Sequence, residues 1–545
     1  AKSQMGSAQE IALRLTPLKD VYYTHDTTFD FNPKGHRETN YVLLGIAFLI
    51  LFIAGINFTN LTTSLIPLRL KTINTHRVLG CSIYKLRAIS LIESIVICLI
   101  SYILALFIVN DLSYTPIANW VDADIRLSQY KGLILLTALI AILTGCLAGL
   151  YPAIRSTSYA PALVLKGSFG LSPKGKKVRV ALIGFQYTVS IALIIVTLFM
   201  GLQNHFMTSS EQLGFNKDQV AIVNLTPEIY AKHKPQYIQK LKDYPGIEDV
   251  AFSVYELSKE DDMIDLEYAR HEDKDVFFKV FYASENFLSV MDIQVEEGRD
   301  FTREDLNKAQ SDYIINPAAE RDFHLHPGDR FNDRTVLGVS KDFRFNSCRI
   351  ASSPFVFALN NDIPNPKLVS YIRFNSKTNL QEAVAHVRET LKEIDPTFPF
   401  EISFYNTILN NLYQKEQTLG KLISLFGIMA ILISIVGVFG LVLFETQYRR
   451  KEIGIRKING ATTGQILLMF NKTYIRIVSV CFIISIPIAW MGTQQWLENF
   501  AYKTPLHLWV FIVAFLIILS VTIGTVTFRN WQAANENPVN SVKSE

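Results

Sequence analysis

The stretch Arg449-Arg450-Lys451-Glu452-Ile453-Gly454-Ile455-Arg456-Lys457-Ile458-Asn459-Gly460 has an earlier counterpart in this chain. That copy reads Arg69-Leu70-Lys71-Thr72-Ile73-Asn74-Thr75-His76-Arg77-Val78-Leu79-Gly80. An arginine, a lysine, an isoleucine, a second basic residue, a β-branched residue and a glycine recur in register. Each copy follows a long apolar run and precedes another. A basic helix placed twice between membrane spans predicts two contact surfaces for a cytoplasmic partner.

The composition is that of a membrane protein with a large aqueous part. Of 545 residues, 49% are hydrophobic and 19% are charged, and the mean hydropathy is +0.21. Seven nearly charge-free windows are each near or above the ~20 residues that cross a hydrocarbon core. They are residues 41–68, 88–110, 132–154, 180–204, 422–444, 477–497 and 508–528. No such window lies between Asn204 and Lys421, so that stretch is expected to fold in water.

The basic residues orient these spans. Segments 69–87 and 155–179 hold lysines and arginines without an acid, and segment 448–476 is similarly basic. Cytoplasmic loops carry the excess of Lys and Arg, and alternate threading puts all three segments on one side. The net charge of +4 is too small to suggest nucleic acid as a partner. Residues 205–418 are therefore expected outside the cell membrane.

Two halves share one plan of span, basic segment, span, outer loop, span and basic tail. Residues 41–167 and 419–545 are predicted to be these two permease modules. Between them we expect a basic cytoplasmic linker at 168–179, a single span at 180–204 and an outer domain at 205–418. Both basic copies face one side, so the repeats are parallel, unlike the inverted repeats of many secondary transporters. Residues 1–40 are polar and must lie outside, and we expect that a preceding span and most of a first outer domain are missing from the chain.

The outer domain mixes strand and helix patterns, so an α/β fold is predicted for it. Residues 219–225, 250–255, 313–316, 335–340 and 398–404 have strand patterns, and residues 229–244 and 379–394 have helix patterns. Strand–helix–strand order at both ends suggests small α/β modules with a β-rich insert between them.

With the repeat and the outer domain in place, the chain resembles the MacB/FtsX-type ABC transporter permeases. The eight-span form with two modules in one polypeptide is the nearest in plan. The resemblance is carried by residues 450–457 with Gly460 and Ala461, by 56–61 (INFTNL), by 297–301 (EGRDF) and by 339–345 (VSKDFRF). The first module departs from the family pattern, because Lys71-Thr72-Ile73-Asn74 lacks the usual acid and glycine. Its contact with a partner is expected to be weaker or different in geometry.

The resemblance implies a polytopic α-helical membrane protein of seven spans, with an outer domain of the MacB periplasmic-core type. It also implies an ATPase-coupling role for the two basic segments. The residues concerned are Arg69, Lys71, Ile73, Arg77, Gly80, Arg449, Lys451, Glu452, Ile453, Arg456, Lys457 and Gly460. The basic side chains would supply charge, and Ile453, Ile455 and Ile458 would supply apolar anchors. The competing interpretation is that the basic residues merely reach lipid headgroups.

The family further implies a bacterial inner-membrane subunit driven by a separate cytoplasmic ABC ATPase in two copies. ATP and Mg would bind that ATPase, and no cofactor or metal is expected in this chain. Work done in the cytoplasm would move the outer domain, for export or extraction of a substrate such as an antimicrobial compound, a peptide or a lipoprotein. An adaptor, an outer-membrane component or a lipoprotein are further expected partners. The alternative is a non-transporting regulator that activates an outer partner such as a cell-wall hydrolase.

Other motifs point to structure more than to chemistry. Residues 170–177 nearly form a phosphate-binding loop, but they lack the Ser or Thr that holds Mg²⁺ and no strand precedes them. We therefore expect no ATP hydrolysis by this chain. Glu93 lies inside an apolar window, where a carboxylate is a functional candidate by default. Its depth permits an interfacial or an interhelical hydrogen bond, and we favour this structural role. His271, His324 and His326 lie near acids, but without a defined third ligand we interpret them as solvated turns.

Cysteines and aromatic residues complete the predictions. Five cysteines, three of them inside apolar windows, give no disulfide framework. Trp490, Trp496, Trp509, Tyr41 and Tyr502 lie near predicted span ends, where they suit an interfacial aromatic belt.

Overall fold

The structure is a computed structural model that describes residues 17–23, 37–115, 118, 126–158, 173–258, 265–272, 274–308, 310–359 and 368–535. Within these ranges, seven helices are long and apolar enough to cross a membrane, which is the predicted number. They are α2 (Arg37–Ser64), α4 (Ile83–Leu112), α5 (Lys131–Ser156), α7 (Pro173–Thr208), α14 (Gln414–Tyr448), α16 (Thr463–Leu497) and α17 (Leu508–Ala534). The chain is thus a multi-pass membrane protein with an extracytoplasmic domain.

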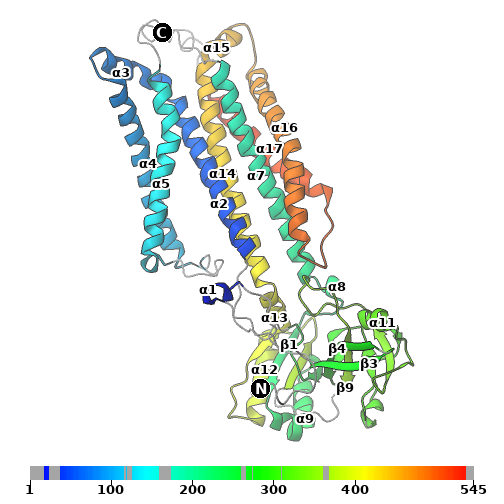
Figure 1. Ribbon diagram of the computed structural model, residues 1–545. Helices are drawn as coiled ribbons and strands as arrows, with labels where there is room; N and C mark the ends of the chain where they lie inside the picture. The colour runs from blue at the N-terminus through cyan, green and yellow to red at the C-terminus, as the bar shows by residue number, and fades with distance from the viewer. Residues whose placement is uncertain are drawn as a thin grey trace.

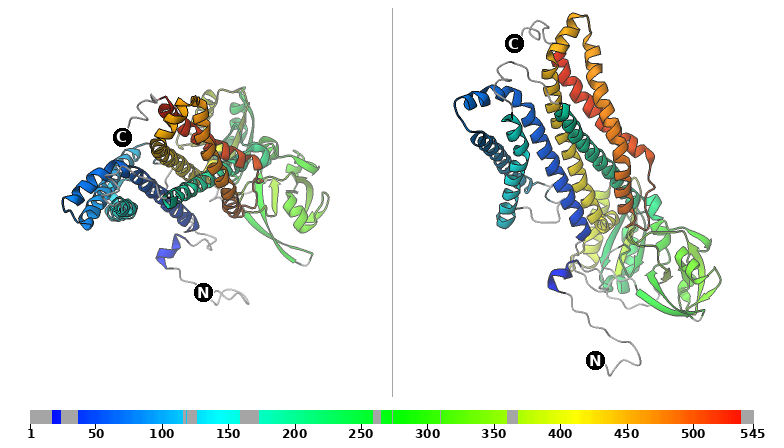
Figure 2. Two further views of the ribbon diagram at one scale, coloured as in Figure 1. Left: turned by 90° about the horizontal axis from the view of Figure 1, so that it is seen from above. Right: turned by 45° about the horizontal axis from the view of Figure 1, so that its top comes forward.

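The seven helices form one densely packed group and one looser group. Helices α7, α14, α16 and α17 share a hydrophobic core that includes Tyr187, Ile191 and Phe199 of α7 and Val478 of α16. Helix α2 lies along α14, and the α4–α5 pair lies outside α2 (Figures 1 and 2). The first predicted module therefore joins the second through α2 and α14.

Two predicted boundaries differ from the structure. The apolar window 41–68 contains a helix break, because α2 ends at Ser64 and α3 (Ile66–Val78) begins two residues later. Pro67 explains the break, since it stands in the first turn of α3, where a proline starts a helix without losing a hydrogen bond. Helix α7 begins at Pro173, so residues 173–179 of the predicted linker are helical. The rest of that linker lies outside the described residues.

The extracytoplasmic domain is built on one mixed sheet, whereas the sequence suggested separate small modules. The strand order is β11-β1-β10-β2-β4-β9-β6-β8-β5, with β3 paired to β4 and β7 to β8. The strands are β1 (Val220–Leu225), β2 (Ile247–Ser253), β3 (Asp265–His271), β4 (Lys274–Ala283), β5 (Val295–Gly298), β6 (Tyr313–Ile315), β7 (Arg330–Phe331), β8 (Arg334–Ser340), β9 (Phe355–Leu359), β10 (Leu368–Phe374) and β11 (Ile402–Phe404). The parallel pairing of β4 with β9 makes the sheet continuous, and local sequence patterns do not encode such a long-range pairing.

Short helices cover the sheet and link it to the membrane part. Helices α9 (Pro227–Lys242) and α12 (Leu380–Ile394), both predicted, bury Leu241, Val387 and Leu391 against one face. The others are α1 (Leu18–Val21), α8 (Ser210–Leu213), α10 (Phe287–Met291), α11 (Pro317–Phe323), α13 (Tyr405–Leu412) and the short 3₁₀ segments η2 (Leu127–Gln129) and η3 (Asp305–Asn307). Helix α13 runs on towards α14, so the domain is continuous in sequence with the bundle on both sides.

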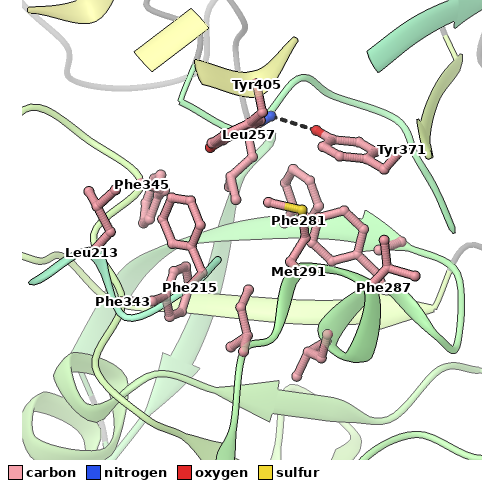
Figure 3. Packing of buried hydrophobic residues seen from close by; sticks show 14 of the residues in the cluster. Leu213, Phe215, Leu257, Phe281, Phe287, Met291, Phe343, Phe345, Tyr371 and Tyr405 are labelled. Atoms are coloured by element: carbon pink, nitrogen blue, oxygen red, sulfur yellow. Dashed lines mark hydrogen bonds between the residues drawn. The ribbon is translucent and has the colours of Figure 1, made fainter. Parts of the chain in front are cut away.

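The opposite face of the sheet holds an aromatic core. Phe281, Phe287, Phe343 and Phe345 gather there, as Figure 3 shows, and all four side chains are buried. Phe343 and Phe345 belong to the VSKDFRF stretch of residues 339–345. This stretch therefore carries two core phenylalanines, with Arg344 between them.

The EGRDF stretch of residues 297–301 forms a tight corner at the end of β5. Gly298 has φ +81, and a Cβ there would overlap the Leu337 carbonyl, so only glycine suits the position. The Arg299 guanidinium donates two hydrogen bonds to the Asp305 carboxylate, at 2.7 and 2.9 Å. This charge-assisted pairing holds the pKa of Asp305 well below its usual range.

Candidate functional site

The two basic segments both form helices, α3 (Ile66–Val78) and α15 (Arg450–Ile458). Figure 1 places both at the end of the bundle that is opposite the sheet domain. Arg77 and Lys457 therefore lie on the same side of the predicted membrane, as the charge pattern requires.

The two copies also share their local geometry. Each helix ends in a glycine of positive φ, +90 at Gly80 and +88 at Gly460. The amide of each glycine donates to the carbonyl three residues earlier, on Arg77 and Lys457, at 3.0 Å in both cases. The left-handed conformation turns the chain into the next span at no steric cost. Both glycines thus have a conformational role that explains their recurrence.

The next helix starts in the same way in both copies. The Ser82 hydroxyl accepts a hydrogen bond from the Lys85 amide, and the Thr462 hydroxyl accepts one from the Gln465 amide. These are N-caps of α4 and α16. The repeat seen in the sequence is therefore a repeat of a complete helix–turn–helix corner.

The charges of α15 are partly neutralised within the corner. Arg449 pairs with Glu445 at 3.1 Å, and Arg456 pairs with Glu452 at 2.8 Å. The Glu445 carboxylate also accepts from the hydroxyl of Tyr474 in α16, at 3.3 Å. Arg449 and Glu445 consequently tie α15 to the spans on either side of it.

The isoleucines of α15 divide into one inward and two outward residues. Ile453 is only 4% exposed and belongs to the core of the four-helix group. Its side chain is already packed inside and offers a partner no surface in this conformation, so its predicted coupling role stays a prediction. Ile455 and Ile458 are 54% and 65% exposed and remain available.

In α3 the same positions have different surroundings. Arg69 pairs with Glu93 of α4 at 2.8 Å, so the carboxylate makes the interhelical bond, one of the two that its position permits. Arg77 donates to the Thr157 carbonyl at 3.2 Å, and Ile73 is half-buried. The side chains of Lys71 and Lys451 lie outside the described set.

Sequence reasoning missed three apolar residues at the first corner. Val78 and Leu79 are 69% and 78% exposed, and Tyr84 is 81% exposed. No sequence pattern signalled them, because their exposure is known only from the folded chain. Each corner thus combines basic groups with exposed apolar groups.

One group in the outer domain has side chains of the metal-ligating kind. Glu297, Glu320 and His326 have ligand atoms within 4.8 Å of one another, and His326 Nδ1 lies 3.6 Å from the Glu320 carboxylate. The structure thus supplies a third group where the sequence offered none. His324 instead takes the left-handed position after α11, at φ +54. Glu297 and His326 are exposed, and exposed acidic groups commonly gather without an ion, so the arrangement alone does not identify a metal site.

All five cysteines, Cys81, Cys98, Cys146, Cys348 and Cys481, are free, as expected from the sequence. Cys348 is buried in the outer domain, and burial raises the pKa of its thiol. A raised pKa keeps the group as the less reactive thiol form. It is therefore a packing residue.

Comparison with known proteins matches both halves of the bundle. Residues 44–161 and 424–538 match the family model "FtsX-like permease C-terminal". The chain is 25% identical over 212 residues to the macrolide export ATP-binding/permease protein MacB of Aggregatibacter actinomycetemcomitans, covering 36% of this chain and 32% of that protein. It is 25% identical over 223 residues to the MacB of Neisseria gonorrhoeae (strain ATCC 700825 / FA 1090), covering 38% and 34%. The chain therefore spans about a third of the length of these relatives.

Two solved structures are similar to part of the chain. The periplasmic region of MacB from Actinobacillus actinomycetemcomitans is 14% identical with a TM-score of 0.28, and the match covers 36% of this chain and 94% of that one. The extracellular domain of the noncanonic ABC-type transporter YknZ from Gram-positive bacteria is 15% identical with a TM-score of 0.26, and the match covers 34% and 99%.

Proposed function

We propose that this chain is a permease of the MacB/FtsX type, the membrane subunit of an ABC complex whose ATPase is a separate cytoplasmic protein. The observation that carries the proposal is the duplicated corner. Two helices of the same pattern, α3 and α15, end in the same glycine geometry at one end of the bundle. Two equivalent docking points suit the two copies of a dimeric ATPase.

The mechanism we propose is transmission of movement along the helices. An ATPase that closes on ATP would displace α15, which Ile453 and the Arg449–Glu445 pair hold to α14 and α16. Helix α14 is continuous with the outer domain through α13, so a displacement of its cytoplasmic end would reach the sheet. The partner would bind ATP and Mg, and this chain would transmit the resulting movement to the outer domain.

The substrate proposed from the relatives' names is a molecule exported from the outer side of a bacterial inner membrane. The exposed apolar and basic groups of the corners bear on coupling and not on substrate choice. We therefore propose that the chain serves export or extraction of an antimicrobial compound, a peptide or a lipoprotein, with an adaptor as a further partner. This substrate class can be tested once the ATPase is identified.

The sharpest test uses the two exposed isoleucines of α15. Ile455→Ala with Ile458→Ala removes apolar surface that the fold does not use, so the chain should fold normally. We expect the amount of ATPase that co-purifies with the chain to fall at least tenfold. The matched control is Leu266→Ala in β3, which removes an equally exposed apolar side chain (66%) from the outer domain.

A second variant, Arg456→Glu with Lys457→Glu, tests the charges of α15. Its control is Lys377→Glu with Arg388→Glu, which reverses two charges in the outer domain. Charge reversal in α15 should release the ATPase or abolish the stimulation of its activity. Charge reversal in the outer domain should do neither. Unchanged co-purification and unchanged ATPase stimulation in both corner variants would rule out the coupling role.

A further inference from the structure

The outer loop between α16 and α17, residues 498–507, enters the extracytoplasmic domain. Phe500 is 3% exposed and belongs to the same core as Phe343 and Phe345. Trp496 and Tyr502 pack against that core from its edge. The aromatic-belt prediction is therefore wrong for these two residues, because they contact protein.

Tyr502 binds the domain segment 341–354 at three points. Its backbone amide donates to the Cys348 carbonyl at 3.1 Å, and its hydroxyl accepts from the Ser352 amide at 3.1 Å. The Arg344 guanidinium lies over its ring, 4.1 Å from the centroid. A cation over an aromatic face that is shielded from water is among the stronger side-chain contacts.

The same segment is bound to the outer ends of α7 and α14. The Arg344 guanidinium also lies 5.3 Å from the ring centroid of Phe206 in α7. Arg349 pairs with the buried Glu416 of α14 at 2.7 Å, and its guanidinium lies 4.7 Å from the ring centroid of Phe500. Through Arg344 and Arg349, the segment thus contacts the outer ends of α7 and α14 and the loop that follows α16.

The loop is fixed to α7 as well. The Gln203 side chain, which is fully buried, donates to the Tyr502 carbonyl at 3.0 Å and accepts from the Thr504 amide at 2.8 Å. Buried amides with both ends paired hold one geometry, because any other geometry would leave a buried polar group without a partner. Figures 1 and 2 show the outer ends of α4 and α5 standing apart from the sheet domain.

We propose that residues 498–507 and 341–354 form a mechanical joint that makes α16 and α17 move with the extracytoplasmic domain, and that Tyr502 is its positioning residue. Helices α7 and α14 are already continuous with the domain along the chain. The joint adds the other two spans of the second module, so that the module and the domain tilt as one body. This inference rests on the proposed function, since the movement to be transmitted comes from the ATPase.

The test measures distances between spin labels in the full chain, with its ATPase, in lipid nanodiscs. Cys81, Cys98 and Cys146 are changed to serine, and Cys348 and Cys481 stay because they are only 1% and 4% exposed. One label pair, Lys377→Cys with Gln495→Cys, spans the joint. A second pair, Lys377→Cys with Lys131→Cys, runs from the domain to the outer end of α5.

For the first pair we expect one narrow distance distribution, with and without ADP–vanadate on the ATPase. Tyr502→Ala should at least double its width, and Tyr502→Phe, which keeps the ring over Arg344, should broaden it less. Lys503→Ala, a change at the exposed neighbour, should leave it unchanged. Arg344→Gln added to Tyr502→Ala should broaden the distribution further, because Arg344 also lies over the ring of Phe206 in α7.

The joint is refuted if Tyr502→Ala leaves the first distribution as narrow as in the parent chain. The second pair reports on the proposed function instead, because a distance shift on vanadate trapping shows that ATPase movement reaches the domain. The two proposals can therefore fail separately. If the distance distribution of the first pair is narrow and depends on Tyr502, while the distance of the second pair does not change with nucleotide, the joint is upheld and the ATPase coupling is rejected.

Discussion

Helix α16 buries a residue at nearly every turn, from Ile466 to Leu497, whereas its counterpart α4 buries two, Leu86 and Ser94. The difference comes from α7, which packs along α16 with Gly184 against Cys481, and Tyr187 and Ile191 in the shared core. Helix α4 packs mainly on α5, where Gly149 approaches Ser94 so closely that a Cβ would lie 2.5 Å from the serine Cβ. Two modules that repeat in sequence therefore differ in how tightly their helices pack within the chain, because their neighbours differ.

The same contrast appears at the cytoplasmic corners. Ile453 is locked into the second module, whereas the equivalent Ile73 is half-buried at the edge of the first. A displacement of α15 would therefore be passed to α14 and α16 as to one solid body. A displacement of α3 would act on a looser group. Under the proposed function, the second module is therefore expected to pass on more of an ATPase movement than the first.

The largest expected difference is in the cost of shortening these two isoleucines. Ile453→Ala should lower the free energy of unfolding by about 2–5 kcal/mol, as core isoleucines do, because the cavity is enclosed. Ile73→Ala should cost less than half of that, since its site is partly open. Chemical unfolding of the purified chain in mixed micelles measures both. An equal loss of unfolding free energy in the two variants would show that the two corners are equally packed, which would contradict the difference argued above.

The second prediction concerns the contact between the modules. A Cβ at Gly437 would collide with the Asn57 amide, and one at Gly440 would collide with Leu61. Gly437→Leu and Gly440→Leu should each cost about 1–3 kcal/mol by overpacking, and should loosen α2 from α14. The control is Gly201→Leu, because nothing lies within 4 Å of a Cβ there.

The measurement is disulfide formation between cysteines placed across α2 and α14, together with the midpoint of thermal unfolding. If the glycine variants cross-link and unfold as the control does, then the modules do not depend on this close approach. The Asn57 side chain donates to the Ile433 carbonyl at 2.6 Å, so the INFTNL stretch contributes a polar tie at the same place.

The sequence predicted what depends on local pattern. Apolar windows located the seven spans, and the basic residues placed α3 and α15 on one side. The register of the two copies also predicted the recurring glycines, whose φ values now explain them. Glu93 was expected to make an interfacial or an interhelical hydrogen bond, and it makes the interhelical one.

What the sequence could not predict depends on which segments meet in space. Ile453 and Ile455 are equally apolar and lie two residues apart, yet one is buried and the other exposed, because only the packed bundle decides which face of α15 is covered. Tyr502 and Phe500 lie at a span end, where an aromatic residue ordinarily indicates lipid contact. The partners of Tyr502 include Arg344 and Ser352, and Phe500 has Arg349 over its ring. These partners are about 150 residues earlier in the chain, and no local pattern connects them.

The smallest expected effect sharpens the comparison of α3 with α15. Glu452→Gln removes the exposed pair with Arg456, which is worth about 0.3–0.5 kcal/mol at an i, i+4 spacing. Hydrogen exchange of the α15 amides should accelerate about twofold at low salt. It should be unchanged at about 1 M salt, where the Debye length is about 3 Å.

The reciprocal change, Thr72→Glu with His76→Arg, places the same pair on α3, where the sequence has neither member. It should slow exchange in α3 by the same factor, and with the same salt dependence, if the two corners differ at this position only in charge. A larger gain in α3 would mean that its missing acid, rather than its looser packing, limits the stability of the first corner.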